Sequence, residues 1–270
     1  MIDSPPKALR FALPPSRGNR FQAAGHQLLE LFLEKPLAPS FSAAVHVCPD
    51  YAQLSQEVMT GQSQLAWAPP ILCARVEHAG GVVVARFERK GLTRYRAALV
   101  CAKDHRLDPK TMRGARAVWV DADSTAGYLL PRVHLHRLGV EPADAFKSES
   151  FAKSYSAALE MVAQGLADFT AVYATPQLAS TARTGVEDVP LAVRDRLQIV
   201  GYTEEAPNDA VIIGPGVELA DRKELQARLL SAMQDPSARY MLGQVFNADA
   251  VELSVPGSYD ALLRLTVIAR

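Results

Sequence analysis

One stretch of the chain, residues 118–128, reads VWVDADSTAGY and sets the expectation for the fold. Its first apolar residues close a short strand predicted at 117–120, and the residues after Gly127 have the apolar spacing of a helix. Two hydroxyl residues, Ser124 and Thr125, lie between them. The N–H groups at a helix N-terminus are unpaired and carry partial positive charge, so hydroxyls there can complete an anion site without Lys or Arg. The other interpretation is an ordinary N-cap.

Strand and helix signals alternate on both sides of this stretch, along 270 residues. Strands separated by helices favour parallel pairing and an α/β architecture. Strands are predicted at 8–13, 41–48, 64–68, 81–89, 94–102, 117–120, 169–173, 197–201 and 209–213. Helices are predicted at 21–34, 51–60, 150–164, 221–234, 237–246 and 258–269, and also after Pro70 and Gly127. Residues 181–194 read as a surface connection.

Several helix ends carry their own signals. Asp50 is placed to cap the helix at 51–60, and Gly61 is placed to end it. Pro69 and Pro70 open the next helix, because proline is tolerated in a first turn. Pro36 is predicted to end the helix at 21–34.

Composition excludes several classes of protein. Hydrophobic residues make up 49% and charged residues 21%, which is typical of a globular chain. Lys plus Arg and Asp plus Glu are both 29, so the basic excess expected for nucleic-acid or polybasic membrane binding is absent. No run of 18 apolar residues and no secretory signal is visible. A cytoplasmic location is therefore expected, or a periplasmic one if a signal has been removed.

The motifs of common cofactor, metal and nucleophile sites are missing. There is no early Gly-x-Gly-x-x-Gly, no phosphate loop, no Gly-x-Ser-x-Gly and no His-Glu-x-x-His. The three cysteines, Cys48, Cys73 and Cys101, have apolar neighbours and spacings that fit no structural zinc site. They are expected to be buried small hydrophobes, and no cofactor or metal is predicted.

Further polar and aromatic residues fall at the ends of predicted elements, where α/β proteins form ligand sites. These residues are Tyr51, Tyr95, Ser154 and Tyr155. Taken singly, each tyrosine is more often a half-buried packing residue. Arg17, in the loop after the first strand, suits a carboxylate or phosphate or is a solvated loop charge.

The order of these features resembles the phosphate/phosphonate-binding proteins of ABC importers, the PhnD-like family, over about residues 9–215. The resemblance rests on the order of these features: Tyr51 with Gly61, Leu65-Ala66-Trp67, Tyr95, residues 123–131, and Ser154-Tyr155 with Gly165 and Asp168. It implies a two-lobed type II periplasmic-binding-protein fold with mixed sheets, helices on both faces and a ligand cleft between the lobes. Lobe one would comprise 1–98 and 202–270, and lobe two 99–201.

The resemblance also implies roles for individual residues. Ser124 and Thr125 match the hydroxyls that hold phosphonate oxygens, whereas Ala126 falls where the family often has another serine. Tyr155 falls where the family often has the histidine of a Ser-His pair that begins here with Ser154. Tyr51 and Tyr95 match aromatic walls of the cleft. Asp209 resembles an acidic position that holds a ligand amine, or is a turn residue before a strand.

The function expected from these residues is non-enzymatic binding of a small oxyanion, such as a phosphonate, phosphate or related ester. Hinge closure would clamp the ligand, and a transporter or a signalling partner would respond to it. Two alternatives remain open at this point. One is an enzyme on the same fold that acts on a small precursor. The other is an interaction module that has lost its ligand, which Ala126 and Tyr155 favour slightly.

Overall fold

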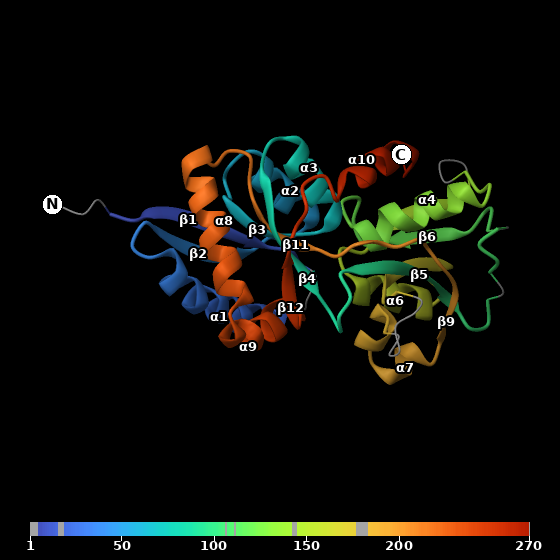
Figure 1. Cartoon of the computed structure of the whole chain (residues 1–270). Helices are drawn as coiled ribbons and strands as arrows, with labels where there is room; N and C mark the ends of the chain where they lie inside the picture. Colours follow the sequence, from blue (N-terminus) through green and yellow to red (C-terminus); the bar gives the residue numbers. More distant parts are fainter. Residues whose placement is uncertain are drawn as a thin grey trace. The chain divides into compact units, whose positions relative to one another are not determined.

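A computed structural model describes residues 5–15, 19–105, 107–110, 112–141, 145–176 and 183–269. The chain forms two compact units (Figure 1). The first contains Met1–Thr93 and Asn208–Asp260, and the second contains Arg94–Pro207 and Ala261–Arg270. The sequence placed these divisions at 98/99 and 201/202, with the whole C-terminal segment in the first lobe. The structure divides at 93/94 and 207/208 because strands β5 and β10 pair with each other from those residues inward.

The sheet of the first unit has six strands in the order β12-β4-β11-β3-β1-β2. Strand β1 is parallel to β2 and β3, whereas β11 is antiparallel to β3 and β4, and β12 is antiparallel to β4. The strands are β1 (Lys7–Leu13), β2 (Phe41–Val47), β3 (Leu65–Ala68), β4 (Val82–Glu88), β11 (Ala210–Ile213) and β12 (Ala250–Leu253). The alternation of strands and helices favoured parallel pairing, and the resemblance implied a mixed sheet; the sheet is mixed, because the chain returns from the second unit through β11.

Helices lie on both faces of this sheet (Figure 1), with α2 and α3 on one side and α1 and α9 on the other. The helical segments are α1 (Asn19–Leu37), α2 (Tyr51–Met59), α3 (Pro70–His78), α8 (Leu219–Gln234), η3 (Pro236–Ala238), α9 (Arg239–Met241) and η4 (Leu242–Phe246). Leucines of α1 and α8 pack with Phe11 and Phe87 in the main core.

Local end signals mostly hold. Asp50 caps α2 by accepting a hydrogen bond from the Gln53 N–H at 2.8 Å, and α3 begins at Pro70, as predicted. The prediction that Pro36 ends α1 is wrong by one residue, since the helix continues to Leu37. Arg228 donates to the Pro36 carbonyl at 3.1 Å and thereby satisfies an acceptor at this helix end.

The second unit is built on another mixed sheet, in the order β10-β5-β8-β6-β7, with β9 paired to β5. Strand β6 is parallel to β7 and β8, and β5 is antiparallel to β8, β9 and β10. The strands are β5 (Arg94–Ala102), β6 (Arg116–Trp119), β7 (Ser148–Phe151), β8 (Phe169–Ala174), β9 (Leu197–Tyr202) and β10 (Ala206–Pro207).

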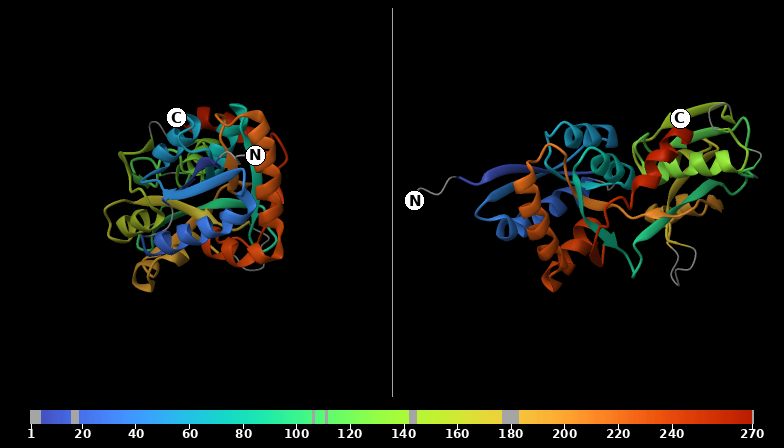
Figure 2. Two further views of the ribbon diagram at one scale, coloured as in Figure 1. Left: turned by 90° about the vertical axis from the view of Figure 1, so that its left-hand side faces the viewer. Right: turned by 45° about the horizontal axis from the view of Figure 1, so that its top comes forward.

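Its helical segments are η1 (Thr125–Leu129), α4 (Leu130–Arg137), α6 (Tyr155–Ala163), η2 (Gly185–Asp188), α7 (Leu191–Arg194) and α10 (Asp260–Ala269). Figure 2 shows α4 and α6 on different sides of the sheet. The helix predicted at 150–164 begins at Tyr155 instead, because Ser148–Phe151 pairs with β6 as an exposed strand. The connection predicted at 181–194 contains η2 and α7 within its described part.

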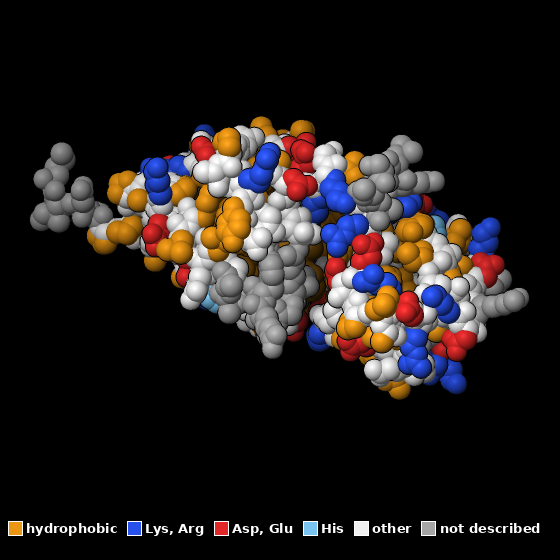
Figure 3. Space-filling model, turned by 90° about the horizontal axis from the view of Figure 1, so that it is seen from below, with side chains coloured by type: hydrophobic (Ala, Val, Ile, Leu, Met, Phe, Trp, Pro, Cys, Tyr) orange, Lys and Arg blue, Asp and Glu red, His pale blue; other side chains and the backbone are white. Residues whose placement is uncertain are grey.

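The predicted fold class is confirmed: both units are α/β with mixed sheets and helices on both faces. Among the described residues, no helix is long and apolar enough to cross a membrane. Basic and acidic side chains are interspersed on the face seen in Figure 3, in keeping with 29 residues of each sign.

Candidate functional site

Residues 118–128 form the end of a strand, a turn and the start of a helical segment in the second unit. Strand β6 ends at Trp119, and Ser124 is the N-cap of η1, which runs on into α4. The Ser124 hydroxyl accepts a hydrogen bond from the Gly127 N–H at 3.2 Å, and the Ser124 carbonyl accepts one from Leu129 at 3.1 Å. The N-cap interpretation of Ser124 is therefore correct, and it leaves the hydroxyl proton available for another acceptor.

Gly127 is needed here because the helical turn lies against the strand end. A Cβ atom built on Gly127 would lie 2.5 Å from Cγ2 of Val120 and 2.9 Å from Oγ of Ser124. The Val120 N–H donates to the Gly127 carbonyl at 3.2 Å, which fixes the same approach. A larger residue would push the turn away from the sheet and would displace the two hydroxyl residues before it.

A second helix start meets the first one. Since β7 is parallel to β6 and neighbours it, the carboxyl ends of both strands lie at one edge of the sheet. Two hydrogen bonds tie their continuations together, from Ala152 N to Trp119 O at 2.8 Å and from Lys153 N to Val120 O at 2.9 Å. Ser154 then caps α6 by accepting from the Ala157 N–H at 3.2 Å.

The pairing of these two helix starts brings Tyr155 to Ser124. The Tyr155 hydroxyl lies 3.3 Å from Oγ of Ser124, within hydrogen-bond distance, and its ring packs edge-on against Tyr173 at 5.6 Å. Ser124, Thr125 and Ala126 are buried, with 1%, 2% and 1% exposure, and Tyr155 is half-buried. We call Ser124, Thr125, Ala126, Ser154 and Tyr155 the hydroxyl cluster.

The hydroxyl cluster has a distinct chemistry, because its side chains are neutral near pH 7. Its hydroxyl groups can each donate one proton, and the backbone amides at two helix starts add partial positive charge. Asp121, which is buried, accepts from the Asp123 N–H at 3.0 Å and has Lys153 Nζ 3.8 Å from its carboxylate. The Asp121–Lys153 pair is not evident from the sequence, although Asp121 is the first polar residue after the apolar run at 118–120.

The remaining predicted site residues lie elsewhere. Tyr95 is half-buried on β5 of the second unit, opposite Ala206 of β10. Tyr51 is buried at the start of α2 in the first unit. Arg17 lies outside the described residues.

Asp209, just before β11 in the first unit, is held by neighbours. Arg89 donates to both of its carboxylate oxygens, at 2.6 and 2.9 Å, and Trp67 Nε1 donates to Oδ2. The Asp209 side chain is 18% exposed. An amine at this carboxylate would thus compete with a bidentate guanidinium. Sequence reasoning missed Arg89, because its partner lies 120 residues further on.

Comparison with known proteins decides the family. The model for the ABC transporter, phosphonate, periplasmic substrate-binding protein family matches residues 11–256. The chain belongs to this family. The resemblance drawn from Ser124–Tyr128, Leu65–Trp67 and Ser154-Tyr155 is confirmed by that match.

Solved structures support the same fold. A PhnD1 protein from Prochlorococcus marinus, in complex with methylphosphonate, is 19% identical with a TM-score of 0.78, over 96% of this chain and 97% of that one. A binding-protein component of an ABC phosphonate transporter from Pseudomonas aeruginosa is 16% identical with a TM-score of 0.77, over 98% and 87%. A Xanthomonas citri protein bound to ATP is 20% identical with a TM-score of 0.75, over 97% of both chains. The phosphonate-binding family member described here therefore has the type II periplasmic-binding-protein fold.

Proposed function

We propose that this chain binds a small oxyanion, a phosphonate, phosphate or related ester, at the hydroxyl cluster, as a non-enzymatic solute-binding or sensor protein. The observation that carries the proposal is the meeting of two helix starts at Ser124 and Tyr155, 3.3 Å apart. Helix starts offer N–H donors, and an anion placed there needs no Lys or Arg. In this proposal the Ser124 and Thr125 hydroxyls donate to the anion, and the Tyr155 hydroxyl supplies a third donor.

The ligand class is supported by two similar structures, whose ligands are methylphosphonate and ATP. Both ligands carry oxygen atoms on phosphorus, which is the chemistry that converging O–H and N–H donors recognise. Ala126 offers no hydroxyl, so the proposed site has one side-chain donor fewer than a third serine would give. A phosphate ester therefore belongs in any ligand screen beside the simple phosphonates.

The proposal extends to the first unit. We place the ligand between the two lobes, with Tyr51 and Tyr95 as walls and with Asp209 and Arg17 as the contacts for its far end. Binding would then close the two units in a hinge movement. Small-angle scattering tests this part: a lower radius of gyration on addition of ligand supports closure, and an unchanged one at saturation contradicts it.

A second function, an interaction module without a ligand, is favoured by one observation. The Ser124 hydroxyl is engaged by Gly127 and contacts Tyr155, so Tyr155 could fill the space that an anion would use. The variant Tyr155→Phe separates the two roles. If Tyr155 is a donor, binding weakens, by about tenfold for one charge-assisted hydrogen bond. If Tyr155 obstructs the site, the parent and the Tyr155→Phe variant bind the anion with equal affinity, or neither binds it.

A thermal-shift screen tests the function itself. The Tm of the full chain is measured alone and with each of these ligands: phosphate, phosphite, sulfate, methylphosphonate, aminoethylphosphonate, ATP and simple carboxylates. A ligand at about 100 times its Kd adds about 2.7 kcal/mol, which shifts the Tm by several degrees. A selective shift supports the proposal, and a flat screen at saturating concentrations contradicts it.

The family is periplasmic by description. In the proposed transport role the protein works outside the inner membrane and delivers its ligand to a transporter. In the sensor role it meets a signalling partner. Fractionation of cells that express the full gene distinguishes these two settings.

A further inference from the structure

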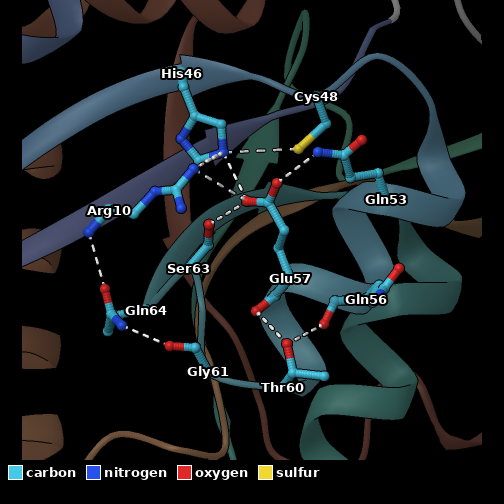
Figure 4. Close-up of polar contacts among 10 residues, drawn as sticks. All are labelled: Arg10, His46, Cys48, Gln53, Gln56, Glu57, Thr60, Gly61, Ser63 and Gln64. Carbon is cyan, nitrogen blue, oxygen red and sulfur yellow. Dashed lines mark hydrogen bonds and ion pairs between the residues drawn. The ribbon is translucent and has the colours of Figure 1, made fainter.

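A second polar cluster lies in the first unit, whereas the hydroxyl cluster belongs to the second, and the proposed function leaves this second polar cluster unused. Figure 4 shows its members converging from β1, the end of β2, and α2. His46 Nε2 lies 2.7 Å from Oε2 of Glu57 and 3.9 Å from Sγ of Cys48. The three potential ligand atoms of His46, Cys48 and Glu57 all lie within 4.8 Å of one another.

The local sequence explains why these side chains meet. His46 and Cys48 are two residues apart at the end of a strand, so they point to the same face of the sheet. Glu57 faces them from α2, the helix that follows directly after Asp50. Cys48 is 1% exposed and Glu57 is 4% exposed, whereas the His46 side chain is 26% exposed and gives the cluster an edge toward solvent.

Glu57 is an ionised carboxylate in a buried place. Burial alone would raise its pKa, but hydrogen bonds from Ser63, Gln53 and His46 outweigh burial and lower the pKa to about 2. Ser63 Oγ donates to Oε2 at 2.7 Å, and Gln53 Nε2 donates to Oε1 at 2.9 Å. These two donors fix the carboxylate in the way that outer-shell groups fix the ligands of a metal.

His46 Nε2 is crowded by three groups at once. Besides Glu57 and Cys48, Nη2 of Arg10 lies 3.2 Å away from it. A single ring nitrogen can donate one proton or accept one, so these neighbours cannot all be satisfied by it. A cation with vacant coordination positions could bind the nitrogen, the carboxylate oxygen and the sulfur together. The Arg10 side chain, which also lies 3.7 Å from Oε2 of Glu57, is 50% exposed, so metal binding would turn it outward to solvent.

We propose that His46, Cys48 and Glu57 form a site for a borderline divalent transition metal ion, with Zn²⁺ as the reference ion and water as the fourth ligand. One N, one S and one O ligand plus an open position match the donor set of zinc. Tetrahedral ligands at about 2.0–2.3 Å from the metal are about 3.3–3.8 Å apart. The distance from His46 Nε2 to Cys48 Sγ, 3.9 Å, is close to this range. The distance from His46 Nε2 to Glu57 Oε2, 2.7 Å, would have to increase by about 0.6 Å.

The Cys48 thiol loses its proton to solvent as the Zn–S bond forms, and the proton on His46 Nε2 is released or passes to Nδ1. No electron is transferred. Arg10 keeps its charge and moves away from His46 Nε2, and the metal takes the place of its guanidinium group.

Cobalt titration of the metal-stripped full-length protein is the direct test. Tetrahedral Co²⁺ absorbs strongly in the visible range, and a bound thiolate adds a charge-transfer band in the near ultraviolet. We expect one equivalent of Co²⁺ to produce both signals and one equivalent of Zn²⁺ to abolish them. The absence of the thiolate band at saturating Co²⁺ overturns the proposal.

Matched cysteine variants locate the thiolate. Cys48→Ser should lose the charge-transfer band, whereas Cys101→Ser should keep it. Cys101 is a fair control because it is a buried cysteine of the second unit, where its sulfur lies 3.5 Å from Gln198 Nε2 and 3.4 Å from the His105 carbonyl. A band that survives in Cys48→Ser, or that disappears in Cys101→Ser, contradicts the assignment. If Cys48→Ser does not fold, His46→Gln replaces it and should weaken Zn²⁺ binding at least tenfold.

Arg10→Gln provides a test in the opposite direction. Removing a positive charge next to the metal position should tighten Zn²⁺ binding, by about tenfold. A weaker affinity would mean that Arg10 supports the bound state, which contradicts the proposed geometry. Neither result depends on oxyanion binding, since methylphosphonate binding is read separately on the same variants.

Discussion

The hydroxyl cluster and the His46–Cys48–Glu57 cluster each lie beside a junction between a strand and a helix, in two different units. In each case a strand ends and a helix begins, β6 before η1 in one unit and β2 before α2 in the other. The first cluster is neutral and holds its hydroxyls at helix starts, whereas the second contains an ionised carboxylate locked by its neighbours. We propose that the side chains beside each junction decide its ligand, an anion at the neutral hydroxyls and a cation at the ionised Glu57.

The largest expected effect is a difference in the free energy of unfolding between a variant of each cluster. Glu57→Gln keeps the volume of the side chain but removes the charge that Ser63 and His46 contact. Because a buried ionic network loses its shared acceptor, we expect a loss of about 3 kcal/mol in the free energy of unfolding. Urea denaturation of the full chain measures it. Ser124→Ala, which removes a helix cap and a neutral contact with Tyr155, should cost about 1 kcal/mol.

Acid titration sharpens the same contrast. The pKa of Glu57 is lowered to about 2 from 4.5, so the unfolded chain takes up this proton first as the pH falls. The stability due to Glu57 should be fully present above about pH 5 and lost progressively toward about pH 2. Denaturation series at several pH values should give a shallower acid slope in Glu57→Gln than in the parent. Equal slopes would mean that Glu57 is not held as described.

Packing at the hydroxyl cluster gives an effect of intermediate size. Gly127→Ala places a Cβ 2.5 Å from Cγ2 of Val120, so the turn must move. We expect a loss of about 2 kcal/mol from overpacking and weaker oxyanion binding in the same variant. Gly243→Ala is the matched control, because nothing lies within 4 Å of its added Cβ. Comparable losses in both variants would argue against the close approach at Val120.

The smallest expected effect concerns the cap of α6. Ser154→Ala removes the acceptor of the Ala157 N–H and should cost about 1 kcal/mol of stability. Ser156→Ala, an exposed position in the same helix, should be nearly neutral. Thermal unfolding of the two variants measures the difference. If they are equally stable, Ser154 contributes no more than a surface residue.

Much of the fold could be predicted from local signals. Asp50 as a cap, Pro70 as a helix start and the strand before Ser124 all depend on neighbours in the sequence, and all were found. Strand β7 was mistaken for the start of a helix, because its pairing with β6 spans about 30 residues and leaves its side chains exposed. Strand β12 was not predicted at all.

The two clusters also differ in how far they could be recognised from the sequence. The hydroxyl cluster could be suspected from Ser124 and Thr125 within one continuous stretch, although the contact with Tyr155 depends on the parallel pairing of β6 and β7. The sequence pattern gave little indication of the second cluster, because His46 and Cys48 look like residues of an apolar strand. Their meaning depends on Glu57, whose position follows from the packing of α2.

Calorimetric titration with methylphosphonate tests the central claim most directly. The parent, Thr125→Val and Thr170→Val are compared, because Thr170 is a buried threonine of the same unit whose hydroxyl lacks a hydrogen-bond partner among the described residues. We expect binding to one site in the parent, weakening of at least about tenfold in Thr125→Val, and no change in Thr170→Val. An absence of heat in the parent at saturating methylphosphonate, or equal affinity in Thr125→Val, would contradict the assignment of the hydroxyl cluster as the oxyanion site.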